Sequence, residues 1–442
     1  MKRLSIFVVV FLLFQIWNLN FVEGKEKIIE FSAPTIVKIQ EYPEGIASQA
    51  TFNGKLDDIL YGTKALMVQN YYGSAFYYNN KVGAVDLRDG KVLWKHILDN
   101  IVIDVRRNEN LFWILTLTSV YQIDINTGII DWKFDHGGAS FSDLPEGKYT
   151  QIVKVKDFSK SDRFIPSFDL DREKERLMIY NSPTSLQLID VAKKELTKEF
   201  NLDIEHDKNE YNFVSFFEDG FLLKNGHMLS RYGEDFQHKI FEFRLRNYAT
   251  EQAQIIEMTD GGKRIAIPGV HYSYLISADG QLIGRYDLED SMLSFTLLGD
   301  KLLLEHMRGR IYCVDAKLEK IWEWKNPIVD NFLFFILPLR WSRAFDSSPV
   351  VFNHRGEKLF MIISTGVLYV VNSEGELVAK ETLIKQPSVK RINDYFSVSS
   401  RLQPVIIDDQ IHAIVSMVTG NIDRSERKFT ITDYLVTLEI KK

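Results

Sequence analysis

The stretch Val82-Gly83-Ala84-Val85-Asp86-Leu87-Arg88-Asp89-Gly90-Lys91-Val92-Leu93-Trp94 occurs a second time, in altered form, as Val120-Tyr121-Gln122-Ile123-Asp124-Ile125-Asn126-Thr127-Gly128-Ile129-Ile130-Asp131-Trp132. Asp86, Gly90 and Trp94 return as Asp124, Gly128 and Trp132, each 38 residues later. A repeat of this length, built from a strand, a tight turn and a return strand, has the period of one four-stranded blade of a β-propeller. The stretch therefore predicts a ring of such blades.

Elementary geometry explains why these residue types occupy these positions. Val82 and Ala84 alternate with other residues, as in a strand with buried sides. Gly90 and Gly128 stand in the turns, where glycine accepts the positive φ that a tight hairpin needs. Each Trp follows on the return strand, where an indole can pack between neighbouring blades while its N–H reaches one carbonyl. Truncating such a Trp to Ala should cost about 3 to 5 kcal/mol.

Further copies of the unit keep parts of the pattern. The third copy is degenerate, because Lys193 and Lys194 stand where the turn glycine is expected and no Trp follows. Counting the turns predicts an all-β propeller of eight four-stranded blades, with seven blades as the alternative. The residues expected to shape the turns or pack the blades are Asp86, Gly90, Trp94, Asp124, Gly128, Trp132, Gly280, Asp315, Trp322 and Gly375.

Two segments are expected to depart from the repeat. The early segment Lys27 to Glu41 predicts one or two strands, which we expect to pair with the C-terminal strands and close the ring. A loop-rich insertion is expected at about 136–175, where the period breaks. Within it, Asp169, Asp171 and Glu173 have the spacing of a calcium loop but lack its glycine and terminal glutamate, so a solvated charged loop is the favoured interpretation.

Residues 1–24 have the pattern of a secretory signal peptide. Two basic residues precede an apolar run, and the small residue Gly24 marks the cleavage region. An uncleaved anchor is the alternative, although Gln15 interrupts the run before it reaches the about 20 residues that span a bilayer. The expected mature chain, 25–442, is a single propeller domain.

Composition limits the function classes. The chain has 442 residues and is 45% hydrophobic, which is enough for a large core. Its 54 basic and 60 acidic residues give a net charge of −6, so there is no electrostatic basis for binding nucleic acid. The single cysteine, Cys313, excludes an intramolecular disulfide, so stability must come from the packing of the sheets.

Two parts of the chain resemble a known repeat. Ser347 to Val351, a following strand, and Gly366 to Val378 are together similar to the repeats of quinoprotein-type propellers, called PQQ-like repeats, as is Val85 to Trp94. Within that superfamily, the units Gly83 to His96 and Gly128 to Phe141 resemble the start of the luminal propeller of subunit 1 of the ER membrane protein complex. The second resemblance implies partners in a membrane-protein complex.

The resemblance also raises the question of catalysis. Quinoprotein dehydrogenases hold their cofactor on the ring axis, typically against a vicinal disulfide and beside a calcium ion. Cys313 alone cannot form that disulfide, and its position between Tyr312 and Val314 favours a buried, unreactive thiol. The nine histidines show no His-x-His or His-Glu-x-x-His pattern for zinc. We therefore expect no cofactor, no metal ligand and no catalytic residue.

One aromatic segment is longer than a connection between blades should be. It runs from Pro327 to Arg343, between the sixth and seventh units. The simpler interpretation makes its apolar part a buried strand of the seventh blade. The functional interpretation is an interaction patch for a partner protein or a bilayer surface. The residues of that patch would be Phe332, Phe334, Phe335, Arg340, Trp341 and Arg343.

Taken together, these patterns predict a non-catalytic protein-interaction scaffold of the secretory pathway, located in the ER lumen or secreted, or in the periplasm of a bacterium. Its partners would be other proteins, such as the subunits of a membrane-protein insertion complex. Two alternatives stay open at this point: a periplasmic scaffold for the assembly of outer-membrane proteins, and a PQQ-dependent dehydrogenase.

Overall fold

A computed structural model describes most of the chain. The described residues are 29–42, 47–49, 56–73, 76–100, 102–137, 166–202, 212–235, 237–246, 253–287, 292–306, 309–327, 348–364, 366–384, 394–400, 404–421 and 428–441. The expected signal peptide and the aromatic patch between Phe332 and Arg343 lie outside these residues.

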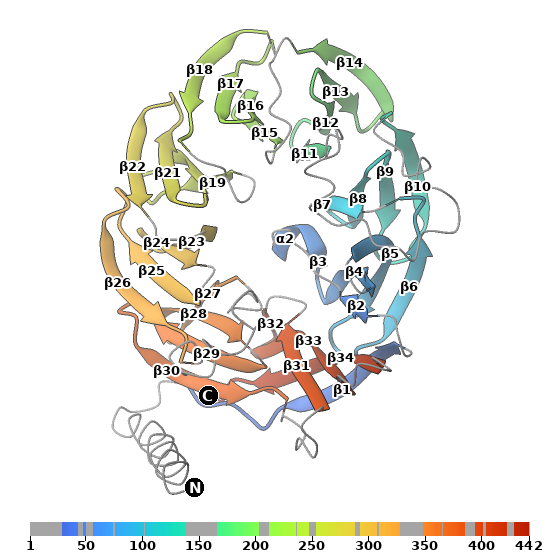
Figure 1. Ribbon diagram of the computed structural model, residues 1–442, viewed down its shortest axis with the longest axis vertical. Coiled ribbons are helices and arrows are strands. Elements are labelled where there is room, and N and C mark those ends of the chain that lie inside the picture. Colours follow the sequence, from blue (N-terminus) through green and yellow to red (C-terminus); the bar gives the residue numbers. More distant parts are fainter. Residues whose placement is uncertain are drawn as a thin grey trace, which may run out of the picture.

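Eight antiparallel sheets stand around a common axis and form a closed ring (Figure 1). Each sheet is one blade. Its first strand lies nearest the axis and its last strand lies at the outer edge. The all-β propeller of eight four-stranded blades is confirmed, and the seven-bladed alternative is wrong.

The elements follow one another blade by blade. Blade 1 has β2 (Ala47–Gln49), α2 (Leu56–Ile59), β3 (Leu60–Tyr61), β4 (Lys64–Gly73), β5 (Phe76–Asp86) and β6 (Val92–Ile97). Blade 2 has β7 (Val102–Asn108), β8 (Leu111–Thr116), β9 (Ser119–Asp124) and β10 (Ile130–Asp135). Blade 3 has β11 (Ser167–Asp171), β12 (Arg176–Ser182), β13 (Ser185–Asp190) and β14 (Glu195–Asn201). Blade 4 has β15 (Phe213–Phe217), β16 (Gly220–Asn225), β17 (Met228–Tyr232) and β18 (Lys239–Arg244).

The second half of the ring repeats this order. Blade 5 has β19 (Gln254–Glu257), β20 (Lys263–Ile267), β21 (Tyr272–Ser277) and β22 (Leu282–Asp287). Blade 6 has β23 (Met292–Leu298), β24 (Lys301–His306), β25 (Arg310–Val314) and β26 (Lys320–Lys325). Blade 7 has β27 (Val350–His354), β28 (Glu357–Ser364), β29 (Val367–Asn372) and β30 (Leu377–Thr382). Blade 8 has β31 (Asp394–Ser400), β32 (Val405–Ile407), β33 (Gln410–Asn421), β34 (Lys428–Glu439) and the early strand β1 (Thr35–Tyr42).

Blade 8 is therefore built from both ends of the chain. Strand β1 pairs antiparallel with β34, with Thr35 opposite Thr437. An isolated bridge between Phe31 and Ile440 extends this contact. In Figure 1, β1 lies beside β34 at the outer edge of the blade. The expectation that the early segment pairs with the C-terminal strands and closes the ring is confirmed.

The apolar core is divided among the interfaces between blades. One cluster joins Trp113 and Leu115 of blade 2 to Leu177 and Ile189 of blade 3, and all four side chains are fully buried. Clusters of the same kind lie between the other neighbouring blades in the described part of the ring. The two middle strands of each blade are buried on both sides, which explains their nearly continuous apolar sequences.

The two faces of the ring carry different connections. On one face, which we call the turn face, short turns join the first strand of a blade to the second, as from Asn108 to Leu111 and from His354 to Glu357. On the opposite face, which we call the connection face, the last strand of each blade leads to the first strand of the next. The longest of these connections join Asp135 to Ser167 and Lys325 to Val350.

The expected insertion at about 136–175 belongs to one of these connections. Its residues 138–165 lie outside the described part of the chain. Its last part is strand β11, the first strand of blade 3, so the regular blade begins well before residue 175. Asp169 and Asp171 thus lie on a strand near the axis. The sequence had favoured a solvated loop for them.

The outer strands share one irregularity. In blades 1 to 7 the pairing between the third and fourth strands shifts register shortly after the turn that joins them. One extra residue, such as Leu93 in β6 or Ile321 in β26, forms a β-bulge there. A bulge twists an exposed strand and discourages pairing with the strand of another molecule.

Candidate functional site: an axial polar cluster

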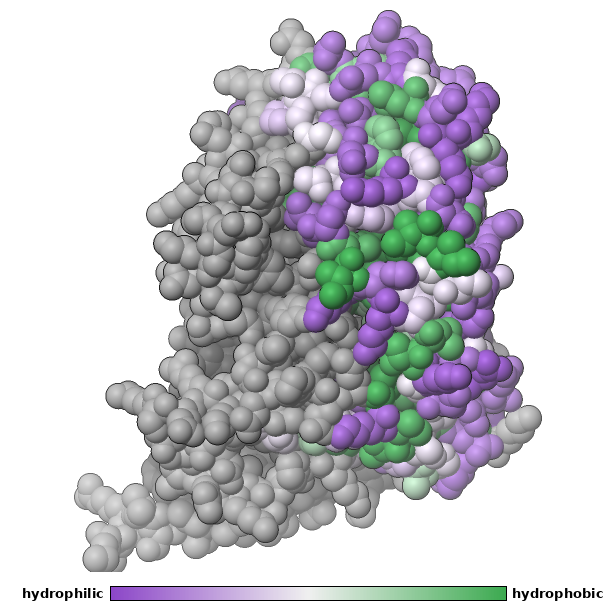
Figure 2. Space-filling model, turned by 90° about the vertical axis from the view of Figure 1, so that its right-hand side faces the viewer, coloured by the Kyte–Doolittle hydropathy of each residue, from purple (hydrophilic) through white to green (hydrophobic). Residues whose placement is uncertain are grey.

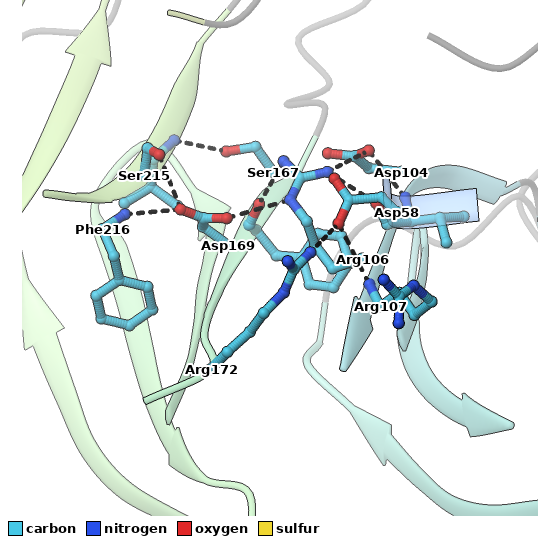
Figure 3. A network of polar contacts seen from close by, with 12 residues as sticks. Asp58, Asp104, Arg106, Arg107, Ser167, Asp169, Arg172, Ser215 and Phe216 are labelled. Carbon is cyan, nitrogen blue, oxygen red and sulfur yellow. Dashed lines mark hydrogen bonds and ion pairs between the residues drawn. The ribbon is translucent and has the colours of Figure 1, made fainter. Parts of the chain in front are cut away.

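Charged side chains from three blades meet in one polar network (Figure 3). They come from α2, from the first strands of blades 2 and 3, and from Arg172 just after β11, and these elements lie near the ring axis (Figure 1). We call this group the axial cluster. The first strand of each blade is a sheet edge, so its outward N–H groups need partners from outside its own blade. The charged members of the cluster are Asp58, Asp104, Arg106, Asp169 and Arg172.

Arg106 on β7 is at the centre of the cluster. Its Nη1 donates to Asp104 Oδ1 at 2.8 Å and to the carbonyl of Val105 at 2.8 Å. Its Nε donates to Asp169 Oδ1 on β11 at 3.1 Å, and the guanidinium lies 5.5 Å from the centre of the Phe168 ring. Arg106 is only 8% exposed. One buried cation therefore joins blade 2 to blade 3.

Asp169 extends this linkage to blade 4. Its Oδ2 accepts hydrogen bonds from Ser215 Oγ and from the backbone N–H of Phe216, both at 2.8 Å. Ser167, two residues earlier on β11, accepts the backbone N–H of Val214 at 3.0 Å. The inner edge of β15 thus gives two backbone donors to side chains of blade 3. A bond of this kind contributes about 1 kcal/mol, and a buried donor left without one costs more.

Asp58 ties α2 to the same blades. It is 3% exposed, and its Oδ1 accepts from Arg172 Nη2 at 2.5 Å and from the backbone N–H of Arg107 at 3.4 Å. Arg107 Nε in turn donates to the carbonyl of Asp57 at 2.7 Å. Arg172 follows β11, and its side chain is 45% exposed. One short helical turn is thus fixed to blades 2 and 3 by polar contacts.

Burial sets the electrostatics of the cluster. It raises the pKa of Asp104, and the Arg106 guanidinium opposes this effect without cancelling it. Burial also disfavours the charge of Arg106, but the carboxylates of Asp104 and Asp169 outweigh it and raise the pKa of that guanidinium. A buried carboxyl with a raised pKa is the type of group that can transfer a proton in catalysis. Here Asp104 accepts from Arg106 and from the Val105 N–H at 2.8 Å, so its contacts are those of a structural link.

The repeated tryptophans lie over the turns of the next blade. Trp94 Nε1 donates to the carbonyl of Ile125 at 2.7 Å, and a Cβ added at Gly128 would lie 2.5 Å from the indole. Trp322 makes the equivalent contacts between blades 6 and 7, at Ser373 and Gly375. The glycines are thus required for two reasons, because each has a positive φ and each is covered by an aromatic ring.

Other interfaces use different residues for the same contact. Phe241 covers Gly280, where the sequence showed the turn but not the residue above it. Val37 and Ile39 of β1 lie 3.4 Å from a Cβ placed at Gly90, so the closing strand takes the place of an aromatic ring.

Trp132 packs between blades 2 and 3, its ring centre 5.6 Å from that of Trp113. The neighbouring turn of blade 3 has Lys194 at a φ of 59° and the turn of blade 6 has Leu318 at 65°, where blades 1, 2, 5 and 7 have Gly90, Gly128, Gly280 and Gly375.

The repeated carboxylates act inside their own turns. Asp124 accepts from the backbone N–H of Thr127 at 2.8 Å, and Asp315 caps its turn in the same way. Asp86 accepts from the backbone N–H and the guanidinium of Arg88, which lowers the pKa of this carboxyl from 3.8 to about 2. The aspartates of the repeat thus shape turns, whereas the aromatic residues join blades.

Sequence reasoning missed the axial cluster. Asp58 and Arg172 are 114 positions apart, so no local motif contains them. Asp169 drew attention only through its calcium-like spacing. One signal was present in the sequence: Asp104 and Arg106 alternate with apolar residues in a strand that should be buried, and buried charges are nearly always paired.

Other chemistry was sought among the residues that the structure describes. They contain no group of three or more His, Cys, Asp or Glu residues placed to hold a metal ion. Cys313 is fully buried on β25, and burial raises the pKa of its thiol to about 11. In the same residues, no helix has the length and hydropathy needed to cross a membrane.

The outer surface of blades 1 to 3 carries separate apolar residues. Ile97 on β6 is 71% exposed and Ile129, just before β10, is 58% exposed. Figure 2 shows that hydrophobic groups on this side are interrupted by hydrophilic residues. Scattered apolar residues of this kind are normal on a protein surface and define no site.

The fold and the axial cluster define an eight-bladed β-propeller with ionic links between its inner strands. No family model and no curated protein matches the chain. Solved structures share the fold. Dihydro-heme d1 dehydrogenase NirN, in complex with DHE, has a TM-score of 0.51 and 9% identity over 90% of this chain and 79% of that chain.

The C-terminal WD40 domain of Sif2 has a TM-score of 0.50 and 11% identity, covering 92% of this chain and 99% of that chain. BamB from Moraxella catarrhalis has a TM-score of 0.48 and 9% identity, covering 90% of this chain and 97% of that chain. With a TM-score below 0.5, it supports no argument about this chain. At such low identity the likeness to these structures concerns the fold alone.

Proposed function

We propose that this protein is a non-catalytic interaction scaffold whose protein partners bind on the connection face. The observation that carries the proposal is the difference between the faces: the connections from blade to blade, including the two longest, all leave from one face, and the other face carries turns within the blades. Binding residues are commonly carried by connections that a rigid framework positions. A closed ring of packed blades is such a framework.

The contacts of the axial cluster and the outer edges support the same proposal. Arg106 and Asp169 use their polar atoms to join blades, and Asp104 holds Arg106 from the same strand, so these contacts are structural. The bulges in the outer strands discourage an added strand at the rim. The connection face therefore fits the role of a docking surface better than the axis or the rim.

The proposal extends to the kind of partner. The pattern of residues 1–24 and the resemblance to PQQ-like propellers, including the luminal propeller of an ER membrane complex, support a scaffold of the secretory pathway. We assign the patch of Phe332, Phe334, Phe335, Arg340, Trp341 and Arg343 to the docking surface. Its connection, from Lys325 to Val350, belongs to the connection face. Subunits of a membrane-protein complex are the proposed partners.

The test is a crosslinked pull-down of the full-length tagged protein, expressed with its own N-terminal segment. Mass spectrometry identifies the partners, and an absorbance scan of the same eluate looks for a quinone. We expect several membrane-complex subunits in the eluate. The double variant F334D and F335D should lose them while keeping the melting temperature of the wild-type protein.

The matched control makes the same change in net charge on the turn face. Lys193 and Lys194 lie in the exposed turn between β13 and β14, and K193Q with K194Q should keep every partner. Loss of partners in this control, and not in the first variant, would contradict the assignment of the connection face. A protein recovered alone with a bound quinone would overturn the scaffold proposal in favour of redox chemistry.

A further inference from the structure

The first strand of blade 1 is interrupted. Strand β2 pairs with one end of β4, at Asn70 to Tyr72, and β3 pairs with the other end, at Lys64 and Ala65. Among the described pairs, Leu66 to Gln69 are joined to β5 and have no inner strand beside them. In the chain, α2 comes between β2 and β3, and it lies close to the ring axis (Figure 1).

The polar attachments of α2 lead to blades other than its own. Its carboxylate at Asp58 meets Arg172 of blade 3 and the Arg107 N–H of blade 2, and its Asp57 carbonyl accepts from Arg107 Nε. Ile59 adds an apolar contact in the core of blades 1 and 2. A single turn of helix has no stability of its own, so these contacts decide whether it stays in place.

From this arrangement we infer that Leu56–Ile59 is an axial latch: a segment that can leave the axis while the ring stays closed, held by the Asp58–Arg172 ion pair. The hydrogen bonds from Arg106 to Asp104 and Asp169 do not include α2, although the charge of Asp58 acts on Arg106. The closing strand β1 lies at the outer edge of the ring. Opening of the latch is therefore a local event.

Opening the latch would change the inner surface of the ring. The Arg107 N–H and the Arg172 guanidinium would lose the carboxylate that they share, and the inner edge of β4 would lose a neighbour. A molecule that binds these groups would bind the open state better and would raise its population. The latch is thus a conformational device that couples the axis of blades 1 to 3 to binding.

Hydrogen exchange of single backbone amides tests this inference in the purified full chain. The amide of Arg107 reports on the latch, because its N–H donates to Asp58. The amides of Phe216 and Phe295 are internal references, because they donate to Asp169 and Gln254 in other parts of the ring. D58N removes the negative charge of the latch. R172Q removes the positive charge that pairs with it, at a side chain that is 45% exposed.

We expect D58N and R172Q each to speed exchange at Arg107 about tenfold, which corresponds to about 1.4 kcal/mol, with less than about twofold change at the references. D57N is the matched control, since the bond from Arg107 uses the Asp57 carbonyl and leaves its exposed carboxylate unused. The inference would be overturned if exchange changed equally at Arg107 and at the references, or if both variants failed to fold. Either result would show that α2 is part of the global fold. A response to D57N as large as that to D58N would also overturn it.

Discussion

Two parts of the ring provide different acceptors for the N–H groups at the inner edges of their blades. Around β7, β11 and β15, buried ions join the first strands of successive blades, with Asp169 accepting from Arg106 on one side and from the Phe216 N–H on the other. Around β19 and β23, the neutral amide oxygen of Gln254 accepts the Phe295 N–H at 3.2 Å. In both places an inner-edge donor has a side-chain partner from the neighbouring blade, charged in the first and neutral in the second.

The difference matters for stability because a buried charge that loses its partner lowers the free energy of unfolding strongly. A buried ion pair often contributes little compared with apolar residues of the same shape, yet removing one member leaves an uncompensated charge. A neutral hydrogen bond carries no such penalty. We therefore expect the ionic side to be the more sensitive to truncation and the neutral side to be the more tolerant.

The largest expected effect is the direct test of this difference. Asp169→Ala removes one of the two carboxylates of Arg106 and the acceptor of Phe216, and should lower the free energy of unfolding by about 3 to 5 kcal/mol. Gln254→Ala on the neutral side should cost about 1 kcal/mol. Denaturant unfolding measures both, and equal losses would show that the charge of the linkage is irrelevant.

The second prediction concerns a contact that both sides share. Gly128→Ala and Gly375→Ala should each cost about 2 to 4 kcal/mol, because the new Cβ would lie 2.5 Å and 2.8 Å from the indoles of Trp94 and Trp322. Gly137→Ala is the control, since its φ of 74° equals that of Gly128 but open space surrounds it. It should cost about 1 kcal/mol. If Gly128→Ala and Gly375→Ala had unequal costs, the two parts of the ring would also differ in the contact between a Trp and the turn of the next blade.

The third prediction concerns the ion pair between Asp86 and Arg88, which lies within one turn and, unlike the pair of Arg106 and Asp169, joins no blades. Arg88 lowers the pKa of Asp86 from 3.8 to about 2, so the folded carboxyl binds its proton less tightly than the unfolded one. The resulting stability is fully present above about pH 4 and is lost as the pH falls towards 2. Melting temperatures between pH 5 and 2 should therefore fall less in D86N than in the wild type. A fall in D86N as steep as that of the wild type would contradict the prediction.

The smallest expected effect tests whether the backbone of the two sides is alike. Glu109 in blade 2 and Arg355 in blade 7 both have a φ of 49°, in the left-handed region that asparagine tolerates better than other side chains. E109N and R355N should each raise the denaturation midpoint slightly, by about 0.5 kcal/mol in stability. A gain at only one position would mean that the turns differ in strain despite their common geometry.

The fold could be predicted because its signals are local and repeated. Gly90 and Gly128 fix turns, Trp94 and Trp132 follow at a constant distance, and the recurrence itself implies a ring. The early strand β1 was also predictable, since a closed ring must join the two ends of its chain. The number of blades followed from counting the turns.

The axial cluster could not be predicted in the same way, because it exists only after the ring has formed. Asp58, Arg106 and Asp169 come from three blades, and their pairing depends on how adjacent first strands face each other. The helical turn α2, which stands between β2 and β3, breaks the repeat and leaves no periodic signal. Phe241 shows the same limit in a milder form, since its partner Gly280 was recognised and the contact was not.

The closure of blade 8 has a consequence for how the chain is made. Strand β1 is synthesised before the seven blades that follow it, and its partner β34, which ends at Glu439, is synthesised after them. At about 5 to 20 residues per second, roughly 20 to 80 s separate the synthesis of the two strands. During that time the nascent chain must keep an extended, partly apolar strand from pairing with the wrong edge. The ring can therefore close only after β34 has been made, and a ribosome that stalls before Lys428 leaves β1 without its partner strand.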